Sequence, residues 1–183
     1  ARGTKVDLSL LHSSSNEEYN VEIVRDRIPI HSVVASFILE EHVGYIKVIR
    51  FSATTAAEFA EAMHDLEQDG ATSVIVDLRA NGGGYMSAAT EMIDRFLDQG
   101  LGIVYTEGKA SPRRDYVSKY DGEYRNWPIA VLIDESSASA SEIFAGAMQD
   151  NDRGLIVGRR SFGKGLVQEE FEVPNSNEGA GAL

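Results

Sequence analysis

The residues best suited to covalent chemistry in this sequence lie at the start of a predicted helix. The segment 134–144 reads Asp-Glu-Ser-Ser-Ala-Ser-Ala-Ser-Glu-Ile-Phe, so small residues follow an apolar run and precede an amphipathic one. Ser139 and Glu142 have the spacing of a capping box, which is one interpretation of the segment. A serine at a helix N-terminus can also be a nucleophile, because the next backbone N–H points at the developing oxyanion. The two interpretations are compatible, and Ser139 is a candidate nucleophile.

A serine nucleophile needs a base, and the sequence offers histidine or lysine. The histidines are His12, His31, His42 and His64. None of them lies in a Gly- or Ser-rich turn, and no G-x-S-x-G motif occurs, so a Ser-His-Asp site is only weakly supported. No two of them have the spacing of metal ligands. Lys164 stands between two glycines after Phe162, where the backbone can turn sharply into a cleft. It can act as a base only if its surroundings lower its pKa from about 10.4 toward about 7–8. Otherwise it is an exposed turn lysine.

Three consecutive glycines, Gly82, Gly83 and Gly84, form the second candidate region. They directly follow a predicted buried strand at 74–78. Such a run fits a tight strand-to-helix turn, and it equally allows backbone N–H groups to face an anion or an oxyanion. The glycines are contiguous, so they do not match G-x-G-x-x-G, and no G-x-x-x-x-G-K-[ST] loop occurs. Nucleotide binding is therefore not indicated.

The overall composition limits the classes of function. Hydrophobic residues make up 43% and charged residues 25% of the chain, close to an ordinary soluble protein. The 29 acidic and 17 basic residues give a formal net charge of −12, which repels phosphate backbones and disfavours nucleic-acid binding. The absence of Cys excludes disulfides and thiolate chemistry. No apolar run approaches the roughly 20 residues that span a bilayer, and the first residues do not read as a signal peptide.

Alternating strands and helices must position these motifs. Two alternating polar–apolar stretches, 4–10 and 19–23, predict a hairpin, and Pro29 marks a seam between residues 1–30 and a core at 31–183. In that core the pattern predicts strands at 33–39, 45–51, 74–78, 101–105, 129–133, 155–157 and 166–173, and helices at 55–70, 86–97 and 139–150. Lys109–Asn126 is charged and aromatic without periodicity and is predicted to be an excursion or lid. The order of elements predicts an α/β domain.

Four segments, taken together and in order, resemble the carboxy-terminal processing, or tail-specific, serine peptidases. They are DLRANGGG at 77–84, SASASEI at 137–143, MQD at 148–150 and FGKGLVQ at 162–168. The opening RGTKVDL at 2–8 resembles the last strands of the PDZ domain that precedes the core in that family. The resemblance covers nearly the whole chain.

The resemblance implies a Ser-Lys mechanism. Ser139 matches the nucleophile, Lys164 the general base and Gln168 the residue that orients the lysine. Asp150 matches an acidic position that the family ties to activity, although a structural role at a helix end fits equally. The backbone N–H of Ala140 and of one glycine, with Gly83 preferred, would form the oxyanion hole.

The resemblance also carries expectations about the whole molecule. It implies the spiral α/β core shared with the crotonase-like and Clp-protease folds, preceded by a partial PDZ-like segment at 1–30 and shortened at the C-terminal end of the 31–183 core. It implies protein or peptide substrates, no cofactor and no metal, and an extracytoplasmic, periplasmic or cell-envelope location. A homo-oligomer and a membrane-proximal full-length protein are compatible with it. Because the PDZ part is incomplete, recognition of a terminal carboxylate is expected to be missing, and activity of this piece alone stays open.

Two other functions are compatible with the residues. A non-catalytic binding module of the same fold could hold peptides or hydrophobic ligands, but it would not need Ser139, Lys164 and Gln168 together. An acyl-CoA hydratase-type enzyme could use the glycine N–H groups for a thioester oxyanion. It would need a catalytic carboxylate, for which Asp134 and Glu135 are the candidates.

Overall fold

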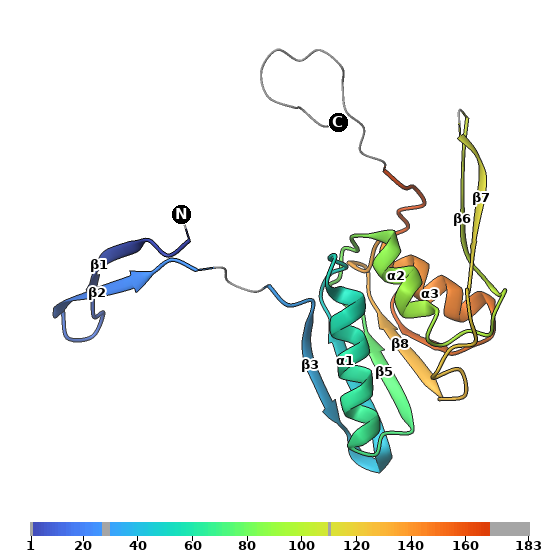
Figure 1. Ribbon diagram of the computed structural model, residues 1–183, viewed down its shortest axis with the longest axis horizontal. Helices are drawn as coiled ribbons and strands as arrows, with labels where there is room; N and C mark the ends of the chain where they lie inside the picture. Colours follow the sequence, from blue (N-terminus) through green and yellow to red (C-terminus); the bar gives the residue numbers. More distant parts are fainter. Residues whose placement is uncertain (1, 27–29, 110, 169–183) are drawn as a thin grey trace. The chain divides into compact units, whose positions relative to one another are not determined.

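A computed structural model describes residues 2–26, 30–109 and 111–168. The chain divides into two compact units, Ala1–Ile30 and His31–Leu183. Figure 1 labels the elements of each unit. In the first unit, β1 (Lys5–Leu11) and β2 (Glu18–Val24) pair antiparallel, as their alternating sequences predict. Most of their side chains are exposed. Whether this hairpin belongs to a PDZ-like domain stays a prediction.

The second unit is built on a five-stranded sheet in the order β3-β4-β5-β8-β9. β3 is antiparallel to β4, and the other neighbouring pairs are parallel. The bounds are β3 Val33–Ile38, β4 Val43–Val48, β5 Ser73–Asp77, β8 Ile129–Ile133 and β9 Leu155–Gly158, with a short 3₁₀ turn η1 at Glu40–His42. Parallel strands need crossover connections, and the predicted α/β fold is confirmed.

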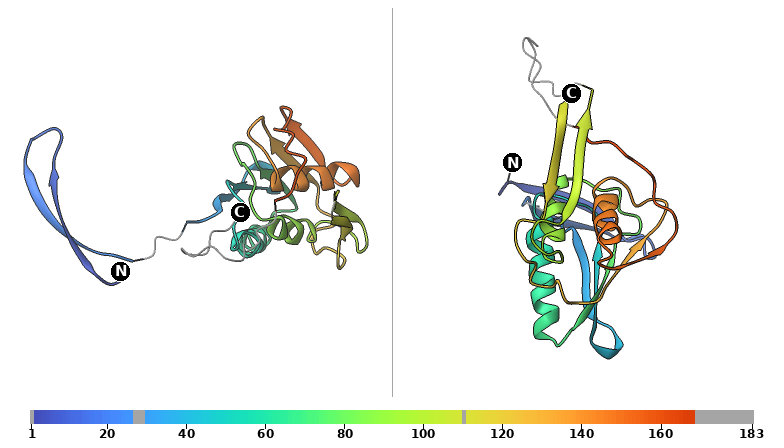
Figure 2. Two further views of the ribbon diagram at one scale, coloured as in Figure 1. Left: turned by 90° about the horizontal axis from the view of Figure 1, so that it is seen from above. Right: turned by 90° about the vertical axis from the view of Figure 1, so that its right-hand side faces the viewer.

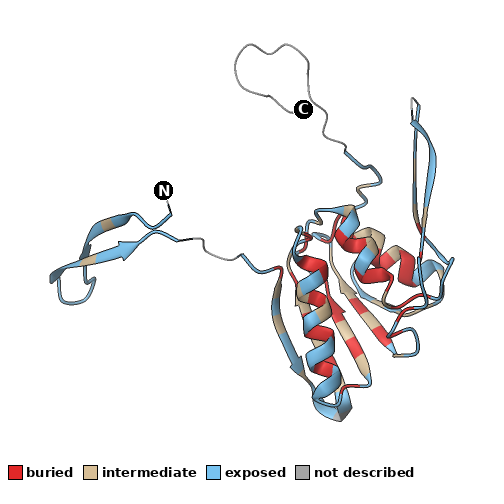
Figure 3. Cartoon of the chain, in the orientation of Figure 1, coloured by how far each residue is buried: buried red, intermediate tan, exposed pale blue. Residues whose placement is uncertain are grey.

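Three helices cover one face of this sheet (Figures 1 and 3). They are α1 (Thr55–Gln68), α2 (Met86–Ile93) and α3 (Ala140–Asp150). Aromatic rings pack where the three helices meet. The ring centroid of Phe96, just after α2, lies 6.1 Å from that of Phe59 on α1 and 6.2 Å from that of Phe144 on α3. All three rings are fully buried. α2 and α3 follow the neighbouring parallel strands β5 and β8, so both helices begin at the same end of the sheet.

The segment predicted to be an excursion contains regular structure. β6 (Gly102–Gly108) and β7 (Ser111–Val117) form a separate antiparallel hairpin that extends away from the main sheet (Figures 1 and 2). The strand predicted at 101–105 is present as part of β6, but the prediction that it is buried was wrong, because only Ile103 is buried among these residues. Hydrophobic alternation did not reveal β7 because most of its side chains are exposed on both faces. In addition, its pairing with β6 contains register shifts.

Three further predictions differ from the structure. The N-cap residue of α1 is Thr54 rather than Thr55, so Thr55 and Glu58 do not form the predicted capping box. Instead, Glu58 Oε2 accepts the N–H groups of Ser32 and Val33 at 2.7 and 3.0 Å. The helix predicted at 86–97 ends at Ile93 and continues as turns. Of the strand predicted at 166–173, residues 166–168 are not in a strand and 169–173 lie outside the described residues. Among the described residues no helix is long and apolar enough to span a membrane.

Candidate active site

The glycine run and the serine segment meet where β5 and β8 end. These neighbouring parallel strands finish at Asp77 and Ile133, so the chain that follows each one starts from the same edge of the sheet. In open α/β sheets this carboxyl edge is where ligands bind. The two candidate regions of the sequence are therefore neighbours in space.

The glycine run packs tightly on both sides. The N–H of Phe51 donates to the carbonyl of Gly83 at 3.0 Å, and the N–H of Tyr85 donates to the carbonyl of Phe51 at 2.8 Å. A Cβ on Gly84 would lie 2.0 Å from the Phe51 carbonyl oxygen, and one on Gly83 would lie 2.8 Å from Ser139 Cβ. Both glycines also have positive φ, 93° and 144°. Only glycine can occupy these positions, and Gly83 lies directly against Ser139.

Buried hydrogen bonds join the two loops. The carbonyl of Asn81 accepts the N–H of Ala138 at 3.0 Å and the hydroxyl of Ser141 at 2.9 Å. The hydroxyl of Ser137 donates to the carbonyl of Leu78 at 2.8 Å. The small residues of the serine segment are thus used to approach the glycine loop closely.

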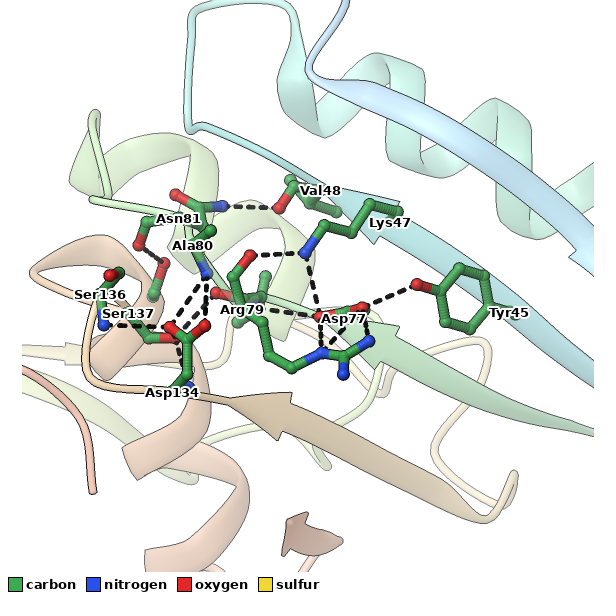
Figure 4. Close-up of polar contacts among 12 residues, drawn as sticks. Tyr45, Lys47, Val48, Asp77, Arg79, Ala80, Asn81, Asp134, Ser136 and Ser137 are labelled. Atoms are coloured by element: carbon green, nitrogen blue, oxygen red, sulfur yellow. Dashed lines mark hydrogen bonds and ion pairs between the residues drawn. The ribbon is translucent and has the colours of Figure 1, made fainter. Parts of the chain in front are cut away.

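The Asp134 carboxylate adds a charged link between the same loops (Figure 4). It accepts the N–H of Ala80, at 3.0 and 3.1 Å to its two oxygens, and the N–H of Ser136 at 3.0 Å. These N–H donors, that of Ala80 first, lower the pKa of Asp134 below its ordinary value. The Asp134 carboxylate is therefore already bound to backbone N–H groups. This disfavours Asp134 as the catalytic carboxylate of a hydratase-type site.

Ser139 has an unusual backbone conformation. It precedes α3 with φ 57° and ψ −114°, a region that residues other than glycine rarely adopt. Such outliers concentrate at functional sites, and a serine nucleophile on a sharp strand-to-helix turn is one recurring case. The next residue, Ala140, is fully buried, and within the described part of the chain its N–H has no acceptor. A free, buried N–H after the serine is what an oxyanion donor requires.

Glu142 brings the lysine segment to the serine. Its Oε2 accepts the N–H of Ser139 at 2.9 Å and that of Lys164 at 3.0 Å. Its Oε1 accepts the hydroxyl of Ser161 at 2.8 Å and the N–H of Gly163 at 2.7 Å. Burial by itself would raise the pKa of Glu142, but these hydrogen bonds outweigh it and the pKa lies below its ordinary value. The sequence indicated Glu142 only as a helix-capping residue.

The predicted site residues are placed as follows. The Lys164 Nζ donates to Gln168 Oε1 at 3.3 Å. Among the described residues no hydrogen bond joins the side chains of Ser139 and Lys164; their backbones meet at Glu142. The N–H of Gly83 donates to Asn81 Oδ1 at 2.9 Å, so it is engaged in this arrangement. Asp150 is the last residue of α3, whose first turn follows Ser139, so it lies at the opposite end of the helix.

A buried ion cluster at the end of β5 was not anticipated from the sequence (Figure 4). Asp77 is 1% exposed and accepts hydrogen bonds from Tyr45 Oη at 2.7 Å, Lys47 Nζ at 3.1 Å and Arg79 Nη2 at 2.6 Å. Burial alone would raise the pKa of Asp77, but these bonds, with that of Arg79 foremost, hold it far below its ordinary value. The cluster fixes the chain just before the glycine run. No group of three His, Cys, Asp or Glu residues with metal-binding geometry occurs in the described ranges.

Known proteins that are similar in sequence identify the family of this chain. A model of "Peptidase family S41" matches residues 42–181, which include both loops, Glu142 and Lys164. The chain belongs to peptidase family S41. A Picosynechococcus protein named carboxyl-terminal-processing protease is 37% identical over 182 residues, 98% of this chain and 43% of that protein. The carboxy-terminal processing protease CtpA of Bacillus subtilis is 36% identical over 177 residues, 96% of this chain and 37% of that protein.

Solved structures of S41 peptidases have the same fold. The photosystem II D1 C-terminal processing protease superposes with a TM-score of 0.68 and 27% identity, over 94% of this chain and 47% of that one. A putative S41 protease from Bacteroides fragilis gives a TM-score of 0.64 at 16% identity, over 96% of this chain and 52% of that one, which supports the fold alone. The chain thus spans less than half the length of the S41 relatives that it matches at 36–37% identity.

Proposed function

We propose that this chain carries the Ser-Lys catalytic site of a serine endopeptidase that cleaves protein substrates near their C-termini. The observation that carries the proposal is the Glu142 carboxylate, one oxygen of which accepts the backbone N–H groups of both Ser139 and Lys164. Residues far apart in the chain are held together there, one on a strained turn and the other on a Gly-flanked loop. Membership of family S41 supports the same assignment.

In this mechanism Lys164, as the free amine, takes the proton from the Ser139 hydroxyl. The serine oxygen attacks the peptide carbonyl, and the tetrahedral intermediate breaks its C–N bond as the leaving amine takes the proton back from Lys164. Lys164 then takes a proton from water, whose oxygen attacks the acyl-enzyme, and the returned proton restores the Ser139 hydroxyl as the acid product leaves. Gln168, whose Oε1 accepts from Lys164 Nζ at 3.3 Å, orients the lysine. Glu142 does not react; it positions both segments.

Two backbone N–H groups would stabilise the oxyanion. Ala140 supplies one, because its N–H is buried and has no acceptor within the described residues. The second comes from the glycine run. Gly83 can supply it only when its bond to Asn81 opens, whereas the N–H groups of Gly82 and Gly84 have no hydrogen bond to a protein acceptor in the described ranges.

The wider expectations stay predictions. We propose protein substrates because the relatives are named carboxyl-terminal processing proteases. A PDZ-like origin of residues 1–30, an extracytoplasmic location and homo-oligomerisation follow from the resemblance. Asp150, at the far end of α3, would support the helix and not the reaction.

The test compares three proteins on an unfolded reporter polypeptide. Ser139→Ala and Lys164→Ala are each expected to abolish cleavage, measured by mass spectrometry of the products, with circular dichroism unchanged from the parent chain. A chain extended to the length of the relatives serves as a positive control if the 183-residue chain cleaves slowly. Retained cleavage in either variant would remove the dyad.

A peptide- or ligand-binding module is the second candidate, and one feature favours it. An open groove of about 660 Å³ is lined largely by apolar residues at the starts of β5, β8 and β9, among them Val74, Ile129 and Leu155. It lies at the opposite end of these strands from the glycine run. Binding of apolar peptides that persists in Ser139→Ala, without cleavage by the parent chain or its longer form, would favour this function.

A further inference from the structure

Asn81 is a buried polar residue of the DLRANGGG segment, and the mechanism above does not use its side chain. It is fully buried between the glycine run and the serine segment. Its Nδ2 donates to the carbonyl of Val48, the last residue of β4, at 2.9 Å (Figure 4). Its Oδ1 accepts the N–H of Gly83 at 2.9 Å. The carboxamide therefore bridges the sheet and the glycine run.

The backbone of the same residue holds the serine segment. The Asn81 carbonyl accepts the Ala138 N–H at 3.0 Å and the Ser141 hydroxyl at 2.9 Å. These donors lie on either side of Ser139. A single buried residue thus contacts β4, the glycine run and both flanks of the proposed nucleophile.

The carboxamide of Asn81 and the backbone of Phe51 together decide which N–H groups of the glycine run are free near Ser139. In a trans peptide the C=O and the following N–H point in opposite directions. The Gly83 carbonyl accepts from Phe51, so the N–H of Gly84 points away from Phe51, and it has no acceptor among the residues described. With the N–H of Gly83 bound to Asn81, the run presents a fixed set of donors beside the free N–H of Ala140.

We propose that Asn81 is a positioning residue of the hydrolytic site: its carboxamide ties the glycine run to β4 and so aligns the backbone donors that stabilise the oxyanion. This inference rests on the proposed function, because only a reaction through an oxyanion uses that alignment. Asn81 is buried behind the glycines, so it acts through them and does not touch the substrate.

Asn151 provides a matched control. Its Nδ2 donates to the carbonyls of Gly102 and Ala147 at 2.9 and 2.8 Å, at the far end of α3. Asn151→Ala therefore removes two carboxamide hydrogen bonds, as Asn81→Ala does, without touching the site. The readout is acylation of the 183-residue chain by p-nitrophenyl acetate, with Ser139→Ala as the baseline. We expect Asn81→Ala to lower kcat by about 10²-fold, comparable to the loss of one oxyanion donor, with KM within about twofold.

Asn81→Asp gives a pH signature that a space-filling role would not. In its protonated form the introduced acid can donate to the Val48 carbonyl and accept from Gly83, as the carboxamide does. When ionised it places a charge against that carbonyl. Burial raises the pKa of the new group. The ratio of kcat for Asn81→Asp to kcat for the parent should therefore fall as pH rises, while the ratio for Asn151→Ala stays flat.

The outcomes separate this inference from the proposed function. If the parent chain and its longer form show no Ser139-dependent acylation, the proposed function fails. The Asn81 inference is then judged by amide exchange in the Ser139→Ala background, where Asn81→Ala should speed exchange at Gly83 and Asn151→Ala should not. If the parent acylates but Asn81→Ala matches Asn151→Ala in kcat, or if exchange at Gly83 is unchanged, the inference is wrong and the proposed function stands.

Discussion

Gly83 illustrates how little space the site leaves at the level of single residues. A Cβ there would lie 2.5 Å from the Ala138 carbonyl and 2.8 Å from Ser139 Cβ, and its φ of 93° disfavours any other residue. Gly83→Ala is expected to displace the serine segment, to lower the free energy of unfolding by about 1–3 kcal/mol and to abolish cleavage. Gly82→Ala is the matched control, because no atom lies within 4 Å of a Cβ at Gly82 and its φ is not positive. Equal effects of the two substitutions in denaturation and cleavage assays would show that the close packing of Gly83 against the serine segment is not what matters.

The Glu142 carboxylate leads to a prediction about pH. Its pKa in the folded protein lies below the ordinary value of 4.5, so its contribution to stability is present above pH 4.5 and is lost as pH falls through the folded-state pKa. Glu142→Gln is expected to lower the free energy of unfolding at pH 7 by about 1.5–3 kcal/mol, typical of a hydrogen bond to a charged group. The difference from the parent should shrink below pH 4.5, as urea titrations would measure.

Glu135→Gln is the control for that experiment. Glu135 pairs with Arg159 on the surface, where both side chains are largely exposed, and exposed ion pairs contribute little to stability. A Glu142→Gln effect no larger than that of Glu135→Gln would show that the carboxylate does not hold the two segments together.

The residues that the sequence singles out differ in a physical way from the contacts that it does not reveal. Ser139 and Lys164 stand out because small residues and glycines surround them locally. The contacts of Glu142, Asn81 and Asp77 were not predicted, since each is made with a partner far along the chain, such as Lys164, Val48 and Tyr45. Hydrophobic periodicity carries no signal for such contacts.

At the level of elements, Arg153 ties together the irregular segments beside α2. Its Nε donates to the carbonyl of Phe96 at 2.7 Å, and its Nη2 donates to those of Tyr124 and Trp127 at 2.8 and 2.6 Å. Burial lowers the pKa of the guanidinium, which nevertheless stays charged. Arg153→Met keeps much of the side-chain length but leaves three carbonyls without this donor. We expect it to lower the free energy of unfolding by about 2–5 kcal/mol in chemical denaturation.

Arg125→Met is the comparison, because Arg125 is exposed and, within the described part of the chain, its side chain is seen only in surface ion pairs with Asp98 and Asp121. It should change stability by less than about 1 kcal/mol. If both variants were equally stable, Arg153 would not be a link between these segments.

Helices and strands can be predicted from the sequence where their side chains pack on the core. The strands of the central sheet and α3 were found because buried apolar runs and a helical stripe mark them. β7 was not predicted because nearly all of its side chains are exposed, and the hairpin is held partly by the Arg113 guanidinium, 4.0 Å from the centre of the Tyr105 ring. The N-terminal contact of α1 was misassigned because Glu58 binds the backbone of β3, a partner that local spacing does not reveal.

At the scale of the whole molecule, the division at residue 30 predicts independent stability of the second unit. The first described unit is a two-stranded hairpin, which is marginal in water by itself, whereas the second contains the buried core formed by the sheet and three helices. A chain of residues 31–183 is therefore expected to unfold in one cooperative thermal transition, within about 2 °C of the main transition of the full chain, in differential scanning calorimetry. Glu58 lies within this shorter chain and keeps its bonds to Ser32 and Val33, so the first strand stays anchored. A large fall in the midpoint would mean that residues 1–30 complete the core, and the unit boundary would have to be redrawn.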